Sequence, residues 1–369
     1  MNALKNMKKT TRSNLITYGI VVVFYVVVQA LTVGGVLNNS MKGMLVPICT
    51  YVVLAISLNL TVGILGELSL GHAGFMSVGA FSGAVFWVVT GSEMPSALGL
   101  ALSMLIGGVV AGVFGFLIGI PVLRLRGDYL AIVTLAFGEI IKNVLNTVYL
   151  GLDSNGFHFS IKDSASMGLA PDGDVIINGA IGISGMKKAS TFLAGIILIL
   201  ITLFVILNLI NSRAGRAIMS IRDNRIAAEA TGINATKYKL MAFIISAVFA
   251  GMAGVLYALN FSALAAKKFD YNTSILVLVF VVLGGIGNIR GSMIAATVLY
   301  VLPELLRGVA DYRMLVYAIV LIVMMIFNQS PQIVAWRAQM AERIAANPKF
   351  RKLAARFQKN GPQGEKGEA

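Results

Sequence analysis

The sequence carries few charged residues for its length, and this shortage decides its broad class. Only 12% of its residues are charged and 57% are hydrophobic, whereas soluble domains usually carry about a quarter charged residues. The hydrophobic residues gather into about ten runs, most of them near the length that crosses a bilayer. We therefore expect an all-α polytopic membrane protein with about ten transmembrane helices rather than a soluble enzyme.

Residues that usually carry chemistry are also scarce. A single cysteine, Cys49, cannot form an intramolecular disulfide or a cysteine-rich metal site. The two histidines, His72 and His158, cannot build a zinc-protease motif. The sequence contains no GxxxxGK[ST] phosphate-binding loop, so the chain lacks that route to ATP hydrolysis. We expect no catalytic residues, no metal and no cofactor on this chain. If ATP powers its activity, another polypeptide must hydrolyse the nucleotide.

The net charge of +14 indicates topology rather than a nucleic-acid partner, because the charges fall in connecting segments and tails. With the N-terminus in the cytoplasm, most of the 30 Lys and Arg residues lie in cytoplasmic segments, as such residues usually do in membrane proteins. The distribution predicts that both termini are cytoplasmic.

Three regions follow from this topology. Residues 1–13 form a basic cytoplasmic tail, 14–328 a transmembrane domain, and 329–369 a second basic cytoplasmic tail. We expect the first apolar run to be retained as a helix rather than cleaved as a signal peptide, because it is nearly long enough to span. The C-terminal tail has the pattern of a basic amphipathic helix that lies on anionic membrane lipid.

Two stretches inside the membrane domain, 59–83 and 283–292, are unusually rich in glycine and polar residues. Glycine weakens a helix, and a carboxylate such as that of Glu67 is unfavourable in lipid. Broken or re-entrant helices that line a cavity accommodate both features. A short cytoplasmic turn that leaves Glu67 and His72 in solvent is the alternative. The candidate pathway residues are Asn59, Glu67, Ser69, His72, Glu139, Asn143, Gly284 and Gly287.

Glu139 and Lys142 lie at helical spacing in the fifth apolar run. Residues three apart share one face of a helix, so these two side chains can pair. We favour an internal pair over a direct role in the pathway.

Small residues four apart in a membrane helix usually mark close packing between helices. The pairs of this kind are Gly79 with Gly83, Gly108 with Gly112, and Gly115 with Gly119.

Residues 151–189 form the longest predicted extracytoplasmic segment, with the Asp, Ser, Asn, Gly and Pro content of a loop. The segment either docks a soluble partner or is an ordinary solvated loop, and its composition fits both.

Residues 211–239 form the longest polar, basic segment between two apolar runs. Its capping residues and small alanines predict a short helix between two spanning helices. Such a helix is shaped for insertion into a groove of a cytoplasmic partner. The alternative is a basic loop that binds lipid headgroups. The predicted boundary residues are Asp223 or Asn224 for the helix cap, Gly232 for its left-handed end, and Asn234 or Thr236 for the next helix.

Long stretches of the sequence resemble one known family. LNLTVGILGELSLGHAGFMSVGA (58–80), RLRGDYLAIVTLAFGEIIKNVLN (124–146) and LGGIGNIRGSMIAA (283–296) are three of them, and residues 215–258 are the longest. Together they resemble the LivM-type membrane permease subunits of branched-chain amino acid ABC importers, over about residues 44–328.

The resemblance implies a type II ABC importer-like permease in the cytoplasmic (inner) membrane of a prokaryote. It implies a second, LivH-type permease, two cytoplasmic ATPases that use ATP, and an extracytoplasmic substrate-binding protein. The implied substrates are leucine, isoleucine and valine. A urea or short-amide importer of the same family is the nearest alternative. A self-sufficient ion-coupled carrier or channel is the alternative from another class, since charged residues lie at membrane depth.

The resemblance also places an ATPase-coupling helix within residues 211–239. The implied coupling residues are Arg222, Asp223, Ala227, Ala228, Glu229 and Gly232. The order of residues 227–232 departs from the wider permease pattern, in which Glu-Ala-Ala is followed by three residues and Gly. The outer loop has Leu152-Asp-Ser-Asn-Gly156 where family members usually have Gly-Gly-Ser-Asn-Gly, so its role stays open.

Overall fold

The computed structural model describes residues 9–306 except 36, 126, 155 and 172, together with a few separate positions between 315 and 326. The chain divides into two compact units, Met1–Leu305 and Leu306–Ala369. The fold described below is that of the first unit. The predicted C-terminal tail and about half of the tenth apolar run lie outside the described residues.

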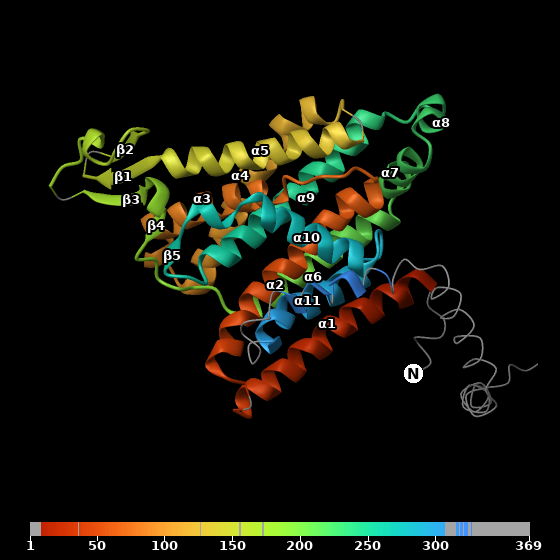
Figure 1. Ribbon diagram of the computed structural model, residues 1–369, viewed down its shortest axis with the longest axis horizontal. Coiled ribbons are helices and arrows are strands. Elements are labelled where there is room, and N and C mark those ends of the chain that lie inside the picture. Colours follow the sequence, from red (N-terminus) through yellow and green to blue (C-terminus); the bar gives the residue numbers. More distant parts are fainter. Residues whose placement is uncertain are drawn as a thin grey trace, which may run out of the picture. The chain divides into compact units, whose positions relative to one another are not determined.

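Helices dominate the first unit (Figure 1). They are α1 (Lys9–Val33), α2 (Asn39–Asn59), α3 (His72–Val89), α4 (Ser96–Val122), α5 (Asp128–Thr147), α6 (Phe192–Asn211), α7 (Arg213–Asp223), α8 (Arg225–Ala230), α9 (Ala235–Ala258), α10 (Tyr271–Gly284) and α11 (Ile289–Leu305). Among the described residues, seven helical segments are long and apolar enough to cross a membrane, and they correspond to the first seven predicted runs. The eighth and ninth runs form α10 and α11, with 14 and 17 residues.

The central helix is α2, which continues directly into a π-helical turn, Leu60–Leu65. Every residue of its membrane-spanning window is buried inside the protein. Helices α6, α9, α10 and α11 pack around it. A π-turn inside a helix often marks a functional position, because it interrupts the regular i→i+4 pattern.

Helices α3, α4 and α9 make the tightest contact in the unit, and glycines explain it. A Cβ atom added to Gly79 would lie 2.3 Å from the Cα of Gly251, and one added to Gly254 would lie 2.1 Å from the carbonyl oxygen of Met76. Six glycines were predicted to pack helices, from Gly79 to Gly119. A Cβ atom added to any of them would lie within 3 Å of an atom of a neighbouring helix. The packing prediction is therefore confirmed.

Short strands correct the expectation of an all-α protein. The predicted outer loop contains β1 (Tyr149–Asp153), β2 (Gly156–Ser160), β3 (Asp174–Asn178) and β4 (Ile183–Ser184), and β5 (Ala263–Leu264) follows α9. The first three form an antiparallel sheet in the order β2-β1-β3, and β4 pairs with β5. The strands lie at one end of the helices, and α7 and α8 lie at the other (Figure 1). The alternation of Phe157 and Phe159 along β2 is a sequence signal that could have indicated this sheet.

Candidate coupling and pathway sites

The segment between α6 and α9 has the boundaries that its sequence predicts. The side chain of Asn224 caps α8, since its Oδ1 accepts a 3.1 Å hydrogen bond from the backbone N–H of Ala227. Gly232 follows α8 with φ +85°, a conformation that strongly favours glycine. Asn234 caps α9 in the same manner, by accepting a 3.0 Å bond from Lys237 N–H. The segment is thus a short, capped helix between α7 and α9.

The residues of α8 divide between an inner and an outer face. Ala228 is buried against Ile221 of α7 and Ala235 of α9. Ala227 and Glu229 are exposed, and Glu229 pairs with Arg225 at 2.8 Å. The side chain of Ala228 therefore packs within the chain itself, and its predicted role in coupling stays a prediction. Ile226, which the sequence reasoning missed, is 82% exposed and is the large apolar side chain on the outer face of α8.

Arg222 and Asp223 end α7 and form an exposed ion pair at 2.9 Å. Arg222 also reaches back to the π-turn, where its Nη1 donates a 3.1 Å hydrogen bond to the carbonyl oxygen of Gly63. Its aliphatic carbons lie against Gly66, at whose Cα an added Cβ would meet Arg222 Cγ at 2.5 Å. The predicted coupling segment therefore touches the first glycine-rich stretch.

That stretch leaves helical geometry after Leu65. Gly66 adopts φ +80°, residues 66–71 have no regular secondary structure, and α3 begins at His72. The side chain of His72 is buried and lies 2.9 Å from Ser57 Oγ, measured from Nε2. A cytoplasmic turn with a solvated His72 is therefore excluded.

Asn59 joins the two glycine-rich stretches. It is fully buried, donates from Nδ2 to Ser292 Oγ at 2.8 Å, and accepts at Oδ1 from the N–H of Gly287 at 2.9 Å. A Cβ on Gly63 would lie 2.3 Å from Gly287 N, so the backbones touch. Gly284 lies beside the start of α11, where an added Cβ would come 2.3 Å from Ser292 N. Three predicted pathway residues, Asn59, Gly284 and Gly287, thus meet at one junction.

Glu67 and Ser69 lie in the non-helical segment 66–71. Glu67 forms an ion pair with Lys239 of α9, and side-chain exposure is 14% for Glu67 and 6% for Lys239. Ser69 is buried, and its hydroxyl has no hydrogen-bond partner among the described residues. Sequence reasoning placed Glu67 at membrane depth but missed Lys239, whose only signal was its position next to the apolar run of α9.

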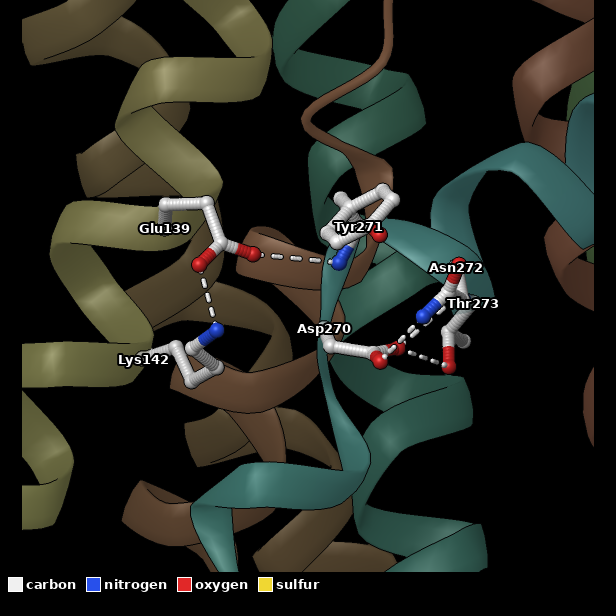
Figure 2. A network of polar contacts seen from close by, with 6 residues as sticks. All are labelled: Glu139, Lys142, Asp270, Tyr271, Asn272 and Thr273. Atoms are coloured by element: carbon white, nitrogen blue, oxygen red, sulfur yellow. Dashed lines mark hydrogen bonds and ion pairs between the residues drawn. The ribbon is translucent and has the colours of Figure 1, made fainter.

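Glu139 lies in a second polar group, on α5 (Figure 2). It pairs with Lys142, as its spacing predicts, and its Oε1 accepts a 3.1 Å hydrogen bond from the N–H of Tyr271 at the start of α10. The side chain of Asp270 caps the same helix by accepting from Thr273 N–H at 3.1 Å. A carboxylate is favourable at a helix N-terminus, so Glu139 both pairs internally and holds α10.

A shallow recess, too narrow to hold a water molecule, lies beside Glu139, between α3, α5 and the start of α10. Leu70, Ala73, Gly138, Phe269 and Ser274 are among its lining residues. Asn143 is exposed one turn further along α5 and does not line it. Among the predicted pathway residues, Asn59, Gly284 and Gly287 form one group at the junction, whereas Glu139 belongs to the second polar group, on α5. Among the described residues, no group of His, Cys, Asp and Glu is arranged to hold a metal ion.

Comparison with known proteins identifies the family. A family model described as the permease component of branched-chain amino acid transport systems matches residues 40–327. The chain belongs to this family. The matched residues include both groups and α8. No solved structure matches the chain.

Curated relatives agree with this assignment. The high-affinity branched-chain amino acid transport system permease protein LivM of Escherichia coli is 37% identical over 305 residues, which cover 79% of this chain and 69% of the relative. LivM of Salmonella typhimurium is 36% identical over 302 residues with the same coverage. The permease LivH of Salmonella typhimurium is 23% identical over 258 residues, or 69% of this chain and 81% of the relative. The chain is thus a multi-pass membrane permease, and its relatives are transporter subunits rather than enzymes.

Proposed function

We propose that this chain is the membrane permease subunit of an ATP-driven importer of leucine, isoleucine and valine. The observation that carries the proposal is α8, a short capped helix with one large apolar side chain exposed, that of Ile226, in a permease whose sequence contains no phosphate-binding loop. A helix of this kind suits insertion into a groove of an ATPase subunit. Relatives named for branched-chain amino acids support the substrate class.

The proposal includes four further subunits. A second permease of the LivH type completes the translocation pathway, two ATPases bind on the cytoplasmic side and hydrolyse ATP, and an extracytoplasmic protein delivers the substrate. The similarity of this chain to both LivM and LivH supports a pair of related permeases. Substrate is then released by alternating access, in which the membrane pathway switches between two states. The loaded binding protein on the outside and ATP on the cytoplasmic side each shift the balance between these states.

We infer that α8 and both termini face the cytoplasm of a prokaryotic cell and that the β1-β3 sheet faces outward. The bias of Lys and Arg toward the α8 side supports this orientation. The separation of α7 and α8 from the strands, at opposite ends of the helices (Figure 1), agrees with it. Residues 151–189, which contain the sheet, are then available to the binding protein.

We infer further that residues 66–71 re-enter the membrane domain. Leu65 lies eight residues beyond Ser57, which is about 12 Å along a helix. The bond between His72 and Ser57 brings the chain back to the depth of Ser57. Non-helical backbone at that depth is stable where protein covers it, and Leu70 N–H is satisfied by Thr134 Oγ1 at 3.0 Å.

Reconstitution tests the proposal. The complete complex in proteoliposomes, with the binding protein, should take up leucine only with ATP, and the chain with its partner permease alone should take up none. The variant Ile226→Asp should lose most ATP-dependent uptake, because a carboxylate is unfavourable in an apolar groove. The variant Lys237→Gln, at an exposed position without an ion-pair partner among the described residues, serves as the control.

An ion-coupled carrier is the second candidate, favoured by the ion pairs Glu67–Lys239 and Glu139–Lys142 within the helical unit. A carrier moves substrate alone when an ion gradient is imposed. Gradient-driven leucine uptake by the isolated chain would support the carrier and contradict the importer proposal.

A further inference from the structure

We propose that Lys239 and Arg222 are positioning residues that tie α8 to the non-helical segment Gly66–Gly71. Through them, a displacement of α8 moves this segment and the turn between α10 and α11 together. The inference rests on the proposed function, because it assigns a route for the movement that an ATPase would impose on α8.

The first step of the route lies within the coupling segment itself. Ala228 of α8 is buried against Ile221 of α7 and Ala235 of α9, and Ile233 and Tyr238 pack on the same cluster. Close-packed side chains transmit displacement because their interface has few voids to absorb it. A force on α8 therefore reaches the last turn of α7 and the first turn of α9.

Lys239 connects the first turns of α9 to the non-helical segment. Its side chain is only 6% exposed and pairs with Glu67, which is itself 14% exposed. The two residues are 172 positions apart in the sequence. Because Lys239 is buried, a direct contact with lipid headgroups or with an ATPase is excluded. A buried charge is held tightly by its partner, since separation leaves either group uncompensated.

Arg222 makes the second connection, from α7. Its guanidinium donates to the Gly63 carbonyl oxygen at 3.1 Å while it also pairs with Asp223. The π-turn is thus held by Arg222 of α7, which precedes α8, and the segment after it by Lys239 of α9, which follows α8. Gly66, at φ +80°, lies between these two attachments and is packed against Arg222.

Beyond the π-turn, the route reaches the second glycine-rich stretch. Gly63 touches Gly287, and Asn59 bonds to both Gly287 N–H and Ser292 Oγ. Gly285 and Gly287 adopt φ +95° and +81° in the turn between α10 and α11. A turn and a segment without regular secondary structure move more easily than the packed helices around them. The structure therefore joins the two movable elements to each other and to α8.

The test uses the complete complex in proteoliposomes and measures leucine uptake and ATP hydrolysis on the same vesicles. In Lys239→Gln and in Arg222→Gln, the leucine taken up per ATP hydrolysed should fall at least about fivefold, the low end of typical coupling. ATP hydrolysis should continue, because neither residue belongs to the ATPase. Reversal of the buried pair, Glu67→Lys with Lys239→Glu, should restore most of the ratio.

A merely structural role predicts a different result. Uptake and hydrolysis would then fall together with the amount of assembled complex, and the ratio would not change. Arg222 has the more exposed side chain of the two residues. An unchanged ratio in Arg222→Gln therefore overturns the inference even if Lys239→Gln fails to assemble. The control Lys237→Gln should keep the ratio of the wild type. If the wild type itself shows no ATP-dependent uptake, the proposed function fails and this inference fails with it.

Discussion

The contact between α3, α4 and α9 and the junction between Gly63 and Gly287 are both built from glycine, yet the glycines act differently. In the first region they lie inside regular helices and allow close packing, as Gly79 does against Gly251. In the second, Gly66, Gly285 and Gly287 have left-handed backbone angles outside helices. The α3–α4–α9 contact is therefore a packed bundle, whereas the junction can change shape. We expect the movements of transport to occur at the junction.

The largest effect is expected when the packed region is broken. Gly79→Leu places a Cβ 2.3 Å from the backbone of Gly251, and no rotamer can relieve a clash with backbone. The free energy of unfolding should fall by about 3 kcal/mol or more, measured by denaturant titration of the detergent-solubilised protein. Gly43→Leu is the matched control, because an added Cβ there meets no atom within 4 Å. Equal stability of the two variants would contradict the packing role.

A smaller effect on stability is expected at the junction. Gly66→Ala introduces a Cβ at φ +80°, which costs about 1–2 kcal/mol, and displaces the Arg222 side chain. The protein should still assemble, but leucine uptake per ATP should fall. Gly35→Ala is the control, with φ +72° and no atom within 4 Å of an added Cβ. The comparison fails if both variants keep the wild-type ratio.

The smallest effect is expected for a glycine with neither role. Gly19 lies in α1, and an added Cβ meets nothing within 4 Å. Gly19→Ala should leave uptake unchanged and change the free energy of unfolding by at most about 1 kcal/mol, in the stabilising direction. A loss of uptake in this variant would show that glycine acts in ways that local geometry does not reveal.

The helices and the boundaries of α8 follow from the sequence because their determinants are local. Apolar runs set the spanning helices, and Asn224, Gly232 and Asn234 act within three residues of themselves. The alternating pattern of β2 was also present, but five residues inside polar loop composition were too weak a signal. Local chemistry is readable wherever both partners lie close in the sequence.

The junction was not readable, because its partners are distant in the sequence. Asn59 and Gly287 are 228 positions apart, and Glu67 and Lys239 are 172 apart. Each member was visible as an unusual polar or glycine residue in an apolar run, yet nothing in the sequence pairs one with another. Ile226 was missed for a different reason, since an isoleucine in a short helix is ordinarily buried and only the fold shows its exposure.

The central claim is that α8 binds an ATPase subunit through Ile226, and a photocrosslinking residue at position 226 tests it most directly. In the assembled complex in membranes, irradiation should join this chain to the ATPase. The same residue at position 157, on the exposed side of β2, should not. No crosslink from position 226, or equal capture of the ATPase from both positions, would contradict the claim.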